Sequence, residues 1–407
     1  MSRPDGVRDV KVGLLTGGQD PHYSHGLTFA LAAKGVEVDF VGSDELDSPA
    51  LRALAGVRFL NLRGSQERSA STLEKVRRVS LYYWRLIQYA MASKAPVFHI
   101  LWNNKIEVLD RTLLMLWYRL CGRRVVFTAH NVNSRRRDGT DTFVNRLTLK
   151  IQYRLCDQIF AHTAKMKQEI IDEFGVRPDR LTLIPYGINN IVPESDLTPE
   201  AAKALLGVPE KAKTILAFGN IGYYKGLDYL VTAFEQLAAN GQEYCLIIAG
   251  KPKPGATEYW DSVRTSLEPH VQQSRAIVHD RHIPDPETEV YFKAADVLVL
   301  PYREIFQSGV LFLGCSFGLP VVAADVGSLS DDVIEDKTGF LFRPHDPMDL
   351  ARTLERYFTS PLFADLQQNR RCIRDYVTSR HSWDDVGDLT RGVYAQFGPA
   401  ENHRDRG

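Results

Sequence analysis

Short apolar runs alternate with longer amphipathic stretches along most of the chain. In the first half the apolar runs lie at residues 10–16, 36–41, 57–62, 97–102, 125–129 and 158–161. Runs of this length are typical of strands that are buried on both faces, and the stretches between them, such as 24–34 and 73–92, have the period of a helix. The alternation predicts a parallel sheet covered by helices.

The pattern changes near residues 181–190, where a predicted strand (LTLIPYGINN) is followed by a proline-marked polar stretch and a short helix. The alternation then restarts, with a predicted helix at 226–239 and apolar runs at 214–218, 245–249, 277–279, 297–300 and 320–323. A chain of 407 residues is also too long for one ordinary core. We therefore predict an α/β protein of two Rossmann-like, doubly wound domains that face a cleft with the carboxyl ends of their strands.

Composition adds a charge asymmetry. Lys plus Arg equal Asp plus Glu at 50 each, yet residues 1–190 hold 28 basic against 19 acidic side chains and the remainder holds 22 against 31. The first half therefore suits an anionic partner, and chance surface composition is the alternative.

The cysteines and the N-terminus indicate a compartment. Five scattered cysteines, without a CxxC motif and among apolar neighbours, are expected to be buried reduced thiols. No apolar run is long enough to cross a bilayer, and the N-terminus does not have the layout of a secretory signal. These features predict a cytoplasmic protein.

Residues 218–227 (FGNIGYYKGL) are the first candidate site. An apolar strand enters a glycine-containing loop with Asn220, which delivers Lys225 and Gly226 at the start of a helix. Amide groups at a helix N-terminus, together with a cation, suit an anion such as a diphosphate. The alternative is a lysine that is solvated at a helix start.

Residues 298–323 are the second candidate site. After a strand, a polar loop carries Glu304, and Ser308 is placed to cap a helix that continues through Gly309 and Val310. The amides of these last three residues suit a phosphate, and Glu304 suits the hydroxyls of a sugar. The alternative is an ordinary capped helix with a solvated glutamate.

The order of these segments resembles the retaining GT-B glycosyltransferases of the group 1 family, also called family four. The resemblance covers residues 10–390, and each segment is short but their order is specific. It implies a GT-B fold and a nucleotide diphosphate sugar as donor. The matching segments are Gly17-Gly18, His130-Asn131, Ala161-His162-Thr163, 184–188 (IPYGI), 218–219 (FG), Lys225-Gly226, 295–301 (ADVLVLP), 318–322 (GLPVV) and 338–342 (TGFLF).

The resemblance also implies roles on the donor side. Lys225 matches the lysine that binds the donor diphosphate, but the family's partner arginine is replaced by Asn220. The two glutamates that contact the donor sugar and the ribose fall on Ile305 and Leu313, with Glu304 one residue from the first. The sequence therefore keeps the scaffold and the lysine and departs from the family at three polar contacts.

In the first domain the residues of interest follow strands. His130 ends a predicted strand and is expected to orient the acceptor or the donor sugar, or else to be a hydrogen-bonded structural residue. Gly18 lets the backbone approach the donor, and His22 or His25 is expected to face the cleft. The expected domains are 1–190 (acceptor side), 191–375 (nucleotide-sugar side), a helix at 376–400 packing back on the first domain, and a tail at 401–407.

A basic and aromatic surface is expected on the first domain. This mix is typical of anchoring to an anionic membrane leaflet, and suits a lipid-linked acceptor. Core aromatic residues surrounded by solvated charges are the alternative, and no nucleic-acid-binding module is present. The residues are Lys75, Arg77, Arg78, Tyr82, Tyr83, Trp84, Arg85, Tyr89 and Lys94 in one helix, and Trp117, Tyr118, Arg119, Arg123, Arg124 and 135–137 beyond it.

Together these features predict a cytoplasmic retaining glycosyltransferase, peripheral at the inner face of the membrane, that transfers a sugar to a glycan or lipid-linked acceptor. No metal is expected, because no carboxylate pair stands at a strand end and Asp331-Asp332 is interpreted as surface. Two alternatives stay open: a non-catalytic GT-B scaffold, and a sugar-nucleotide epimerase on the same fold.

Overall fold

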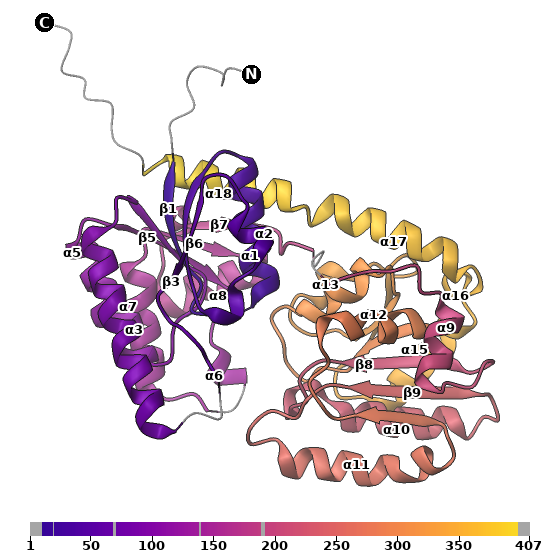
Figure 1. Cartoon of the computed structure of the whole chain (residues 1–407). Helices are drawn as coiled ribbons and strands as arrows, with labels where there is room; N and C mark the ends of the chain where they lie inside the picture. The colour runs from indigo at the N-terminus through magenta and orange to yellow at the C-terminus, as the bar shows by residue number, and fades with distance from the viewer. Residues whose placement is uncertain (1–9, 19, 68–70, 138–139, 189–191, 398–407) are drawn as a thin grey trace, which may run out of the picture. The chain divides into compact units, whose positions relative to one another are not determined.

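The computed structural model describes residues 10–18, 20–67, 71–137, 140–188 and 192–397. The chain forms two compact units, the first made of Met1–Gly187 and His381–Gly407 and the second of Ile188–Arg380. Each unit is a parallel sheet covered by helices (Figure 1). The predicted α/β class with two Rossmann-like units is confirmed.

The first unit is built on seven parallel strands in the order β3-β2-β1-β4-β5-β6-β7. The order reverses beside β1, so the loops after β1 and β4 lie at a topological switch point. The strands are β1 (Lys11–Leu15), β2 (Glu37–Gly42), β3 (Val57–Asn61), β4 (Val97–Ile100), β5 (Arg124–Ala129), β6 (Gln158–Ala161) and β7 (Leu181–Leu183). The helices are α1 (Pro21–Ala33), α2 (Pro49–Arg52), α3 (Thr72–Ala92), α4 (Glu107–Leu109), α5 (Met115–Leu120), α6 (Ser134–Arg137), α7 (Phe143–Leu155), α8 (Ala164–Phe174) and α18 (Trp383–Ala395), with a π-helical turn at Asp110–Leu114.

Helix starts in this unit follow local chemistry. A Ser, Thr or Asp precedes the first turn and accepts a hydrogen bond from the amide three residues on, as Thr142 does from Asn145 and Thr163 does from Met166. These caps satisfy amides that a helix leaves without acceptors.

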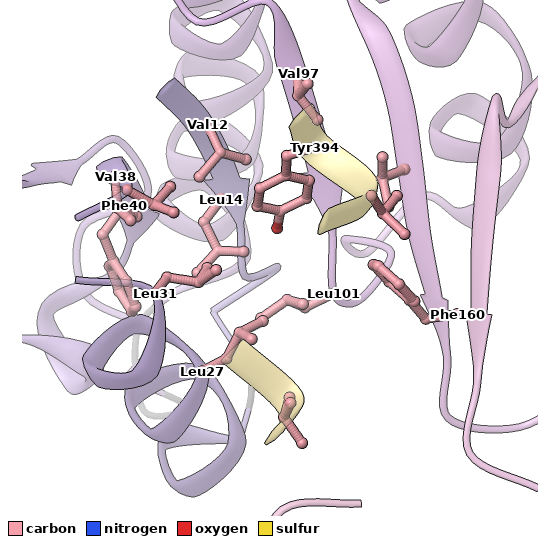
Figure 2. Close-up of a cluster of buried hydrophobic side chains, with 14 of the residues drawn as sticks. Val12, Leu14, Leu27, Leu31, Val38, Phe40, Val97, Leu101, Phe160 and Tyr394 are labelled. Atoms are coloured by element: carbon pink, nitrogen blue, oxygen red, sulfur yellow. The ribbon is translucent and has the colours of Figure 1, made fainter. Parts of the chain in front are cut away.

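Helix α18, from the far end of the chain, completes the core of the first unit. Its Tyr394 enters a cluster formed by side chains of β1, β2, β4, β6 and α1 (Figure 2). The Tyr394 hydroxyl lies 2.6 Å from Nδ1 of His99, a fully buried residue of β4. At the other end of α18, Trp383 packs so closely on Gly26 and Gly187 that a Cβ at either glycine would lie within 2.5 Å of the indole.

The second unit has six parallel strands in the order β10-β9-β8-β11-β12-β13, with its switch point between β8 and β11. The strands are β8 (Lys213–Phe218), β9 (Tyr244–Ala249), β10 (Ala276–His279), β11 (Val297–Leu300), β12 (Val321–Ala324) and β13 (Gly339–Phe342). The helices are α9 (Pro199–Leu206), α10 (Leu227–Ala238), α11 (Thr257–Gln272), α12 (Asp285–Ala294), α13 (Gly309–Ser316), α14 (Leu329–Asp332), α15 (Pro347–Phe358), α16 (Pro361–Ala364) and α17 (Leu366–Arg380), with a 3₁₀ turn, η4, at Tyr223–Lys225.

Three sequence expectations are wrong in detail. The strand expected at 181–190 ends at Leu183, because Pro185 cannot donate to a ladder. Cys372 is exposed, since its apolar neighbours in sequence point to other sides of α17; the five cysteines are free thiols. Asp332 is half-buried rather than a surface residue, and burial, then the charge of Asp331, raises its pKa to about 7.

Candidate active site

The two candidate segments of the second unit meet at its switch point. Lys225, at the end of η4, is 6% exposed, and its Nζ donates to the carbonyl oxygen of Phe218 at 3.2 Å and to the hydroxyl of Tyr302 at 2.8 Å. The Tyr302 hydroxyl lies 3.0 Å from Oγ of Ser308. Because an ammonium group only donates, Tyr302 accepts from Lys225 and its own proton is available to Ser308. The chain of contacts joins the loop after β8 to the helix after β11.

Ser308 caps α13 as the sequence predicts, accepting from the amide of Leu311 at 3.3 Å. The amides of Gly309 and Val310 lie in the first turn, where a helix has no acceptor of its own to offer them. A Cβ placed on Gly219 would lie 3.1 Å from Cγ2 of Val310 and 3.4 Å from Nζ of Lys225, so these groups converge on one glycine. The structure therefore gathers an ammonium group and helix-terminal amides, the components of an anion site.

Gly226 fixes the distance between these two loops. Its φ of +63° is in the left-handed region, and a Cβ there would lie 2.0 Å from the carbonyl oxygen of Pro301. Only glycine combines this conformation with so close an approach.

Arg303 is a clamp that sequence reasoning missed. Its guanidinium carbon lies 4.1 Å from the ring centroid of Tyr223 and 4.0 Å from that of Tyr229, and it forms an ion pair with Asp228. Its amide donates to the carbonyl oxygen of Tyr224 at 2.9 Å. Arg303 thus holds the loop after β11 against the segment that carries Lys225. No local signal marks it, because its partners lie about seventy-five positions earlier in the chain.

The other predicted donor-side residues are not joined to this cluster by side-chain contacts. Glu304 and Asn220 are exposed and make no hydrogen bond or ion pair with other residues in the described part of the chain. Ile305 and Leu313, at the family's two glutamate positions, are each 8% exposed and pack in the interior. Neither of these aliphatic side chains can receive a hydrogen bond from a sugar or a ribose.

In the first unit the switch-point loops pack against each other. Gly17 and Gly18 have φ values of +61° and +67°, and a Cβ on Gly17 would lie 2.8 Å from the carbonyl oxygen of Trp102. The carbonyl of Gly18 accepts from Nε2 of Gln66 at 2.7 Å. The loop is therefore a close-packed turn.

His130 lies at the end of β5 in an aromatic setting. Its ring is stacked on Trp102 with centroids 4.3 Å apart and meets the edge of Tyr23 at 4.6 Å. Desolvation, followed by the nearby imidazoles of His162 and His99, lowers the pKa of His130 well below its usual value. His130 is therefore a neutral imidazole near pH 7.

The hydrogen bonds of the histidine pair set its tautomers. Nδ1 of His162 lies 3.3 Å from the carbonyl oxygen of Ile184, which only accepts, so this nitrogen carries the proton. Burial lowers the pKa of His162 to about 4, which leaves its Nε2 unprotonated. That Nε2 lies 3.2 Å from Nδ1 of His130, which must then be the donor. The remaining nitrogen, Nε2 of His130, is a buried lone-pair acceptor without a hydrogen-bond partner among the described residues.

His25 and His99 of the first unit have structural contacts. Nε2 of His25 lies 2.9 Å from the carbonyl oxygen of Leu46, and His99 lies between Tyr394 and Thr128. Within the described residues, no three His, Cys, Asp or Glu side chains gather as a metal site. In the same part of the chain, no helix is long and apolar enough to span a bilayer.

Family models match both units. The model described as Glycosyltransferase Family 4 matches residues 22–190, and the model described as Glycosyl transferases group 1 matches residues 212–360. A D-inositol 3-phosphate glycosyltransferase of Xylanimonas cellulosilytica is 30% identical over 59% of this chain and 57% of that protein. One with the same name from Streptosporangium roseum is 28% identical over 52% of this chain and 49% of that protein. The matched region thus spans about half the length of these relatives.

Solved structures share the fold across almost the whole chain. Sucrose-phosphate synthase of Thermosynechococcus elongatus superposes with a TM-score of 0.73 at 20% identity, over 96% of this chain and 99% of that one. Anabaena Alr3699/HepE, solved with UDP and glucose, gives 0.72 at 15% identity, over 96% of this chain and all of that one. With family models on both units and this fold, the chain belongs to the group 1, family four glycosyltransferases of GT-B fold.

Proposed function

We propose that the chain transfers a sugar, with retention of configuration, from a nucleotide diphosphate sugar to a hydroxyl group of a glycan or lipid-linked glycan. The observation that carries the proposal is the buried Lys225 at the switch point of the second sheet. Removing an ammonium group from water costs free energy, unless hydrogen-bond acceptors or an anion replace its hydration. The diphosphate of the donor supplies such an anion.

The chemistry follows from the departing diphosphate, on which negative charge develops as the sugar leaves. Lys225 and the amides of Gly309 and Val310 stabilise that charge, because preorganised donors need not reorient during the reaction. Glu304 contacts hydroxyls of the sugar, and it is exposed and without another partner among the described residues. Arg303 is a positioning residue, since it holds the loop of Glu304 against the loop of Lys225.

In the first unit, His130 accepts a hydrogen bond from a substrate hydroxyl. Its lowered pKa and its single unpartnered nitrogen support a lone-pair acceptor rather than a proton donor. The backbone turn at Gly18 lies at the carboxyl end of β1, where a ligand meets the sheet.

The test combines donor binding and turnover. A panel of nucleotide diphosphate sugars is screened by thermal shift, and turnover is measured with lipid-linked saccharides and with the inositol phosphate named for the relatives. Lys225→Met is expected to lose the donor-induced shift, because the ammonium group is removed. Lys211→Met, an exposed lysine of the same unit, is the matched control and retains the shift. If every donor fails to stabilise the wild type, or if both variants respond alike, the proposal is wrong.

The same assay distinguishes two alternative functions, a non-catalytic scaffold and an epimerase. These alternatives are suggested by the exposed Asn220 and by the buried Ile305 and Leu313, at positions where the family has polar contacts. Donor binding without turnover, with every acceptor tested, supports a non-catalytic scaffold. A changed sugar nucleotide formed without any acceptor supports an epimerase.

A further inference from the structure

The outer surface of one helix layer in the first unit is unusually apolar. Helices α3, α5 and α7 lie side by side on one face of the sheet (Figure 1). Of the nineteen exposed large hydrophobic side chains in the described part of the chain, thirteen belong to these helices and the turns joining them. Single exposed apolar side chains are ordinary, but a contiguous group marks an interaction surface. The thirteen are Leu73, Val76, Leu81, Trp84, Met91, Ile106, Val108, Leu113, Leu116, Leu120, Phe143, Val144 and Leu147.

Helix α3 is apolar on two opposite sides. Its inner side buries Tyr82, Leu86 and Tyr89 against the unit. Leu73 and Trp84, 81% and 56% exposed, lie on the outer side together with the remaining exposed apolar residues of this helix. At 100° per residue these exposed positions fall within one arc of roughly 140°. A helix that needed only to cover its own sheet would be polar on that side.

Helices α5 and α7 continue this surface. Leu113, Leu116 and Leu120 follow at helical spacing, and Leu120 is 80% exposed. On α7, Phe143 is also 80% exposed, and Leu147 lies one turn further on the same side. We call the outer side of α3, α5 and α7 the α3–α5–α7 face.

The aromatic residues first expected to form this surface are largely in the core. Tyr82, Tyr83, Tyr89 and Tyr118 are each at most 9% exposed, because they lie on the sheet-facing sides of their helices. Trp84 is the exposed exception. The face is therefore mainly aliphatic.

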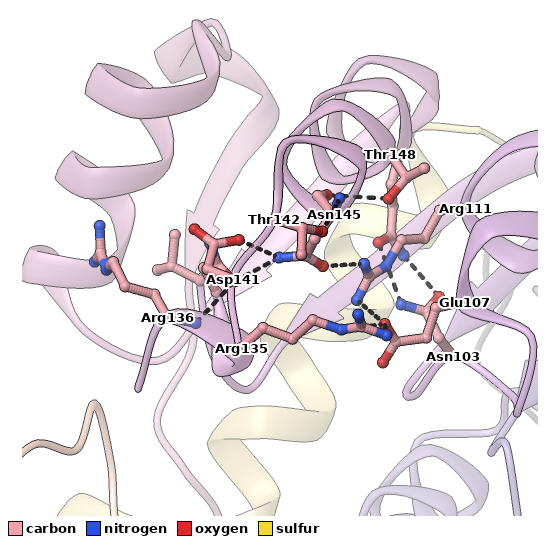
Figure 3. A network of polar contacts seen from close by, with 12 residues as sticks. Asn103, Glu107, Arg111, Arg135, Arg136, Asp141, Thr142, Asn145 and Thr148 are labelled. Carbon is pink, nitrogen blue, oxygen red and sulfur yellow. Dashed lines mark hydrogen bonds and ion pairs between the residues drawn. The ribbon is translucent and has the colours of Figure 1, made fainter. Parts of the chain in front are cut away.

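The face is also strongly basic. Residues 71–155 hold sixteen Lys and Arg against five Asp and Glu. Part of this charge is neutralised inside the layer: Arg111 and Arg135 both pair with Glu107, and Arg111 donates to Asn145 at 2.7 Å (Figure 3). Six exposed cations have no ion pair in the described part of the chain: Lys75, Arg77, Lys94, Lys105, Lys150 and Arg154.

Cations and apolar side chains are interleaved. Arg77 follows Val76 on the exposed side of α3, and Lys150 and Arg154 continue the line of Phe143 and Leu147 along α7. Beside this line, a groove of about 550 Å³ is lined by Phe143, Arg146, Leu147 and Lys150 of α7 together with Arg136, Glu173 and Phe174. Long basic side chains can lay their stems on apolar surface and keep the charge at its edge.

We propose that the α3–α5–α7 face docks on a lipid leaflet rich in anionic phospholipid. The aliphatic side chains and Trp84 enter the boundary between headgroups and acyl chains, and the cations interleaved with them, Arg77, Lys150 and Arg154, contact the headgroups. Charge complementarity favours this occupant over a second copy of the chain, since two such faces would bring six unpaired cations together. The proposal does not depend on the catalytic one, because it concerns a different surface.

The test is co-sedimentation of the full chain, without any sugar nucleotide, with vesicles of phosphatidylcholine and with vesicles that also contain phosphatidylglycerol. Binding is expected only to the anionic vesicles and is expected to weaken at high salt. The triple variant Arg77→Gln, Lys150→Gln, Arg154→Gln lowers the partition coefficient on the order of a hundredfold, at about fivefold per cation. The matched control replaces three exposed cations of the second unit, Lys211, Lys337 and Arg371, by Gln and leaves binding unchanged.

A second variant tests the apolar part. Leu73→Ser with Leu120→Ser is expected to keep the wild-type melting temperature, because both side chains are about four-fifths exposed, and to lose vesicle binding. Equal binding to neutral and anionic vesicles, no binding to either, or equal loss in the control variant would overturn the proposal. It is equally overturned if these serines turn a dimer into a monomer while vesicle binding is absent, because the face is then a protein interface.

Discussion

The close approach of Gly226 to Pro301 gives a quantitative prediction. Gly226→Ala adds a Cβ that would lie 2.0 Å from the carbonyl oxygen of Pro301 and 3.2 Å from Cδ2 of Tyr229, at a residue with φ of +63°. The carbonyl oxygen of Pro301 belongs to the backbone, so it cannot rotate away as a flexible side chain would. The loop after β11 must therefore move away from the segment that carries Lys225.

Two costs add up in this variant. An L-residue in the left-handed region costs about 1–2 kcal/mol, and forcing an extra carbon into a packed site costs about 1–3 kcal/mol more. The expected loss of stability is thus about 2–5 kcal/mol. Gly241→Ala is the matched control, because Gly241 is in the same unit with φ of +75° and nothing within 4 Å of its added Cβ. The control should lose only the cost of the left-handed backbone conformation, about 1–2 kcal/mol.

The assay is urea unfolding of the full chain followed by far-UV circular dichroism, with donor-induced thermal shift as the second measurement. Gly226→Ala is expected to lower the unfolding midpoint more than Gly241→Ala and to weaken the donor response, because it displaces Lys225. Equal midpoints for the two variants would refute the argument that contact with Pro301, rather than backbone conformation, requires this glycine.

Three further predictions concern Arg303 and His130 of the candidate site and His99 of the core. Arg303→Lys keeps the positive charge, but lysine cannot stack between Tyr223 and Tyr229 or form a two-pronged ion pair with Asp228. Steady-state kinetics should therefore show the KM for the donor raised about tenfold, with kcat less affected. An unchanged KM would contradict the positioning role of Arg303. His130→Phe keeps an aromatic ring stacked on Trp102 but removes the accepting nitrogen, so turnover should fall about tenfold. The free energy of unfolding should also fall by about 1–3 kcal/mol, because Nε2 of His162 loses its hydrogen-bond donor. Full turnover would contradict the proposed contact between His130 and a substrate hydroxyl. Burial lowers the pKa of His99 to about 3. Below pH 6.5 this histidine is therefore protonated in the unfolded chain but neutral in the folded chain, so the free energy of unfolding decreases as the pH falls. Between pH 7 and 5, His99 should account for roughly 2 kcal/mol of the decrease in the free energy of unfolding. Urea unfolding of His99→Gln should therefore show a smaller decrease over this pH range than the wild type. Equal decreases would contradict the lowered pKa of His99.

The strands of both sheets are the part of the fold that the sequence specifies best. β11 and most of β9 coincide with unbroken apolar runs, because a parallel strand buried on both faces favours apolar residues at every position. α3 shows the limit of such patterns. Both of its sides are apolar, so periodicity alone does not reveal that Tyr82 and Tyr89 face the sheet while Trp84 faces outward.

The candidate site likewise has residues whose placement the sequence predicts and residues whose placement it does not. Ser308 as a helix cap and Lys225 after a strand depend on neighbours in sequence, and local chemistry predicts their placement. The clamp of Arg303 and the pairing of His130 with His162 join residues from different strands, and no local spacing encodes them. Glu304 is the reverse case: its place in the loop is predictable, but among the residues that the structure describes its side chain has no partner that would fix its direction.

The contribution of α18 to the first unit has a consequence for synthesis on the ribosome. The first unit needs Tyr394 and Trp383 for its core, yet the whole second unit, Ile188–Arg380, is translated before them. At roughly 5–20 residues per second, the nascent first unit waits on the order of 10–40 seconds without Tyr394 in its core and without the hydroxyl group that lies beside Nδ1 of His99. The second unit, whose segment is continuous, can reach its native core before the first one does. For this protein the order of emergence from the ribosome and the order of completion are therefore reversed.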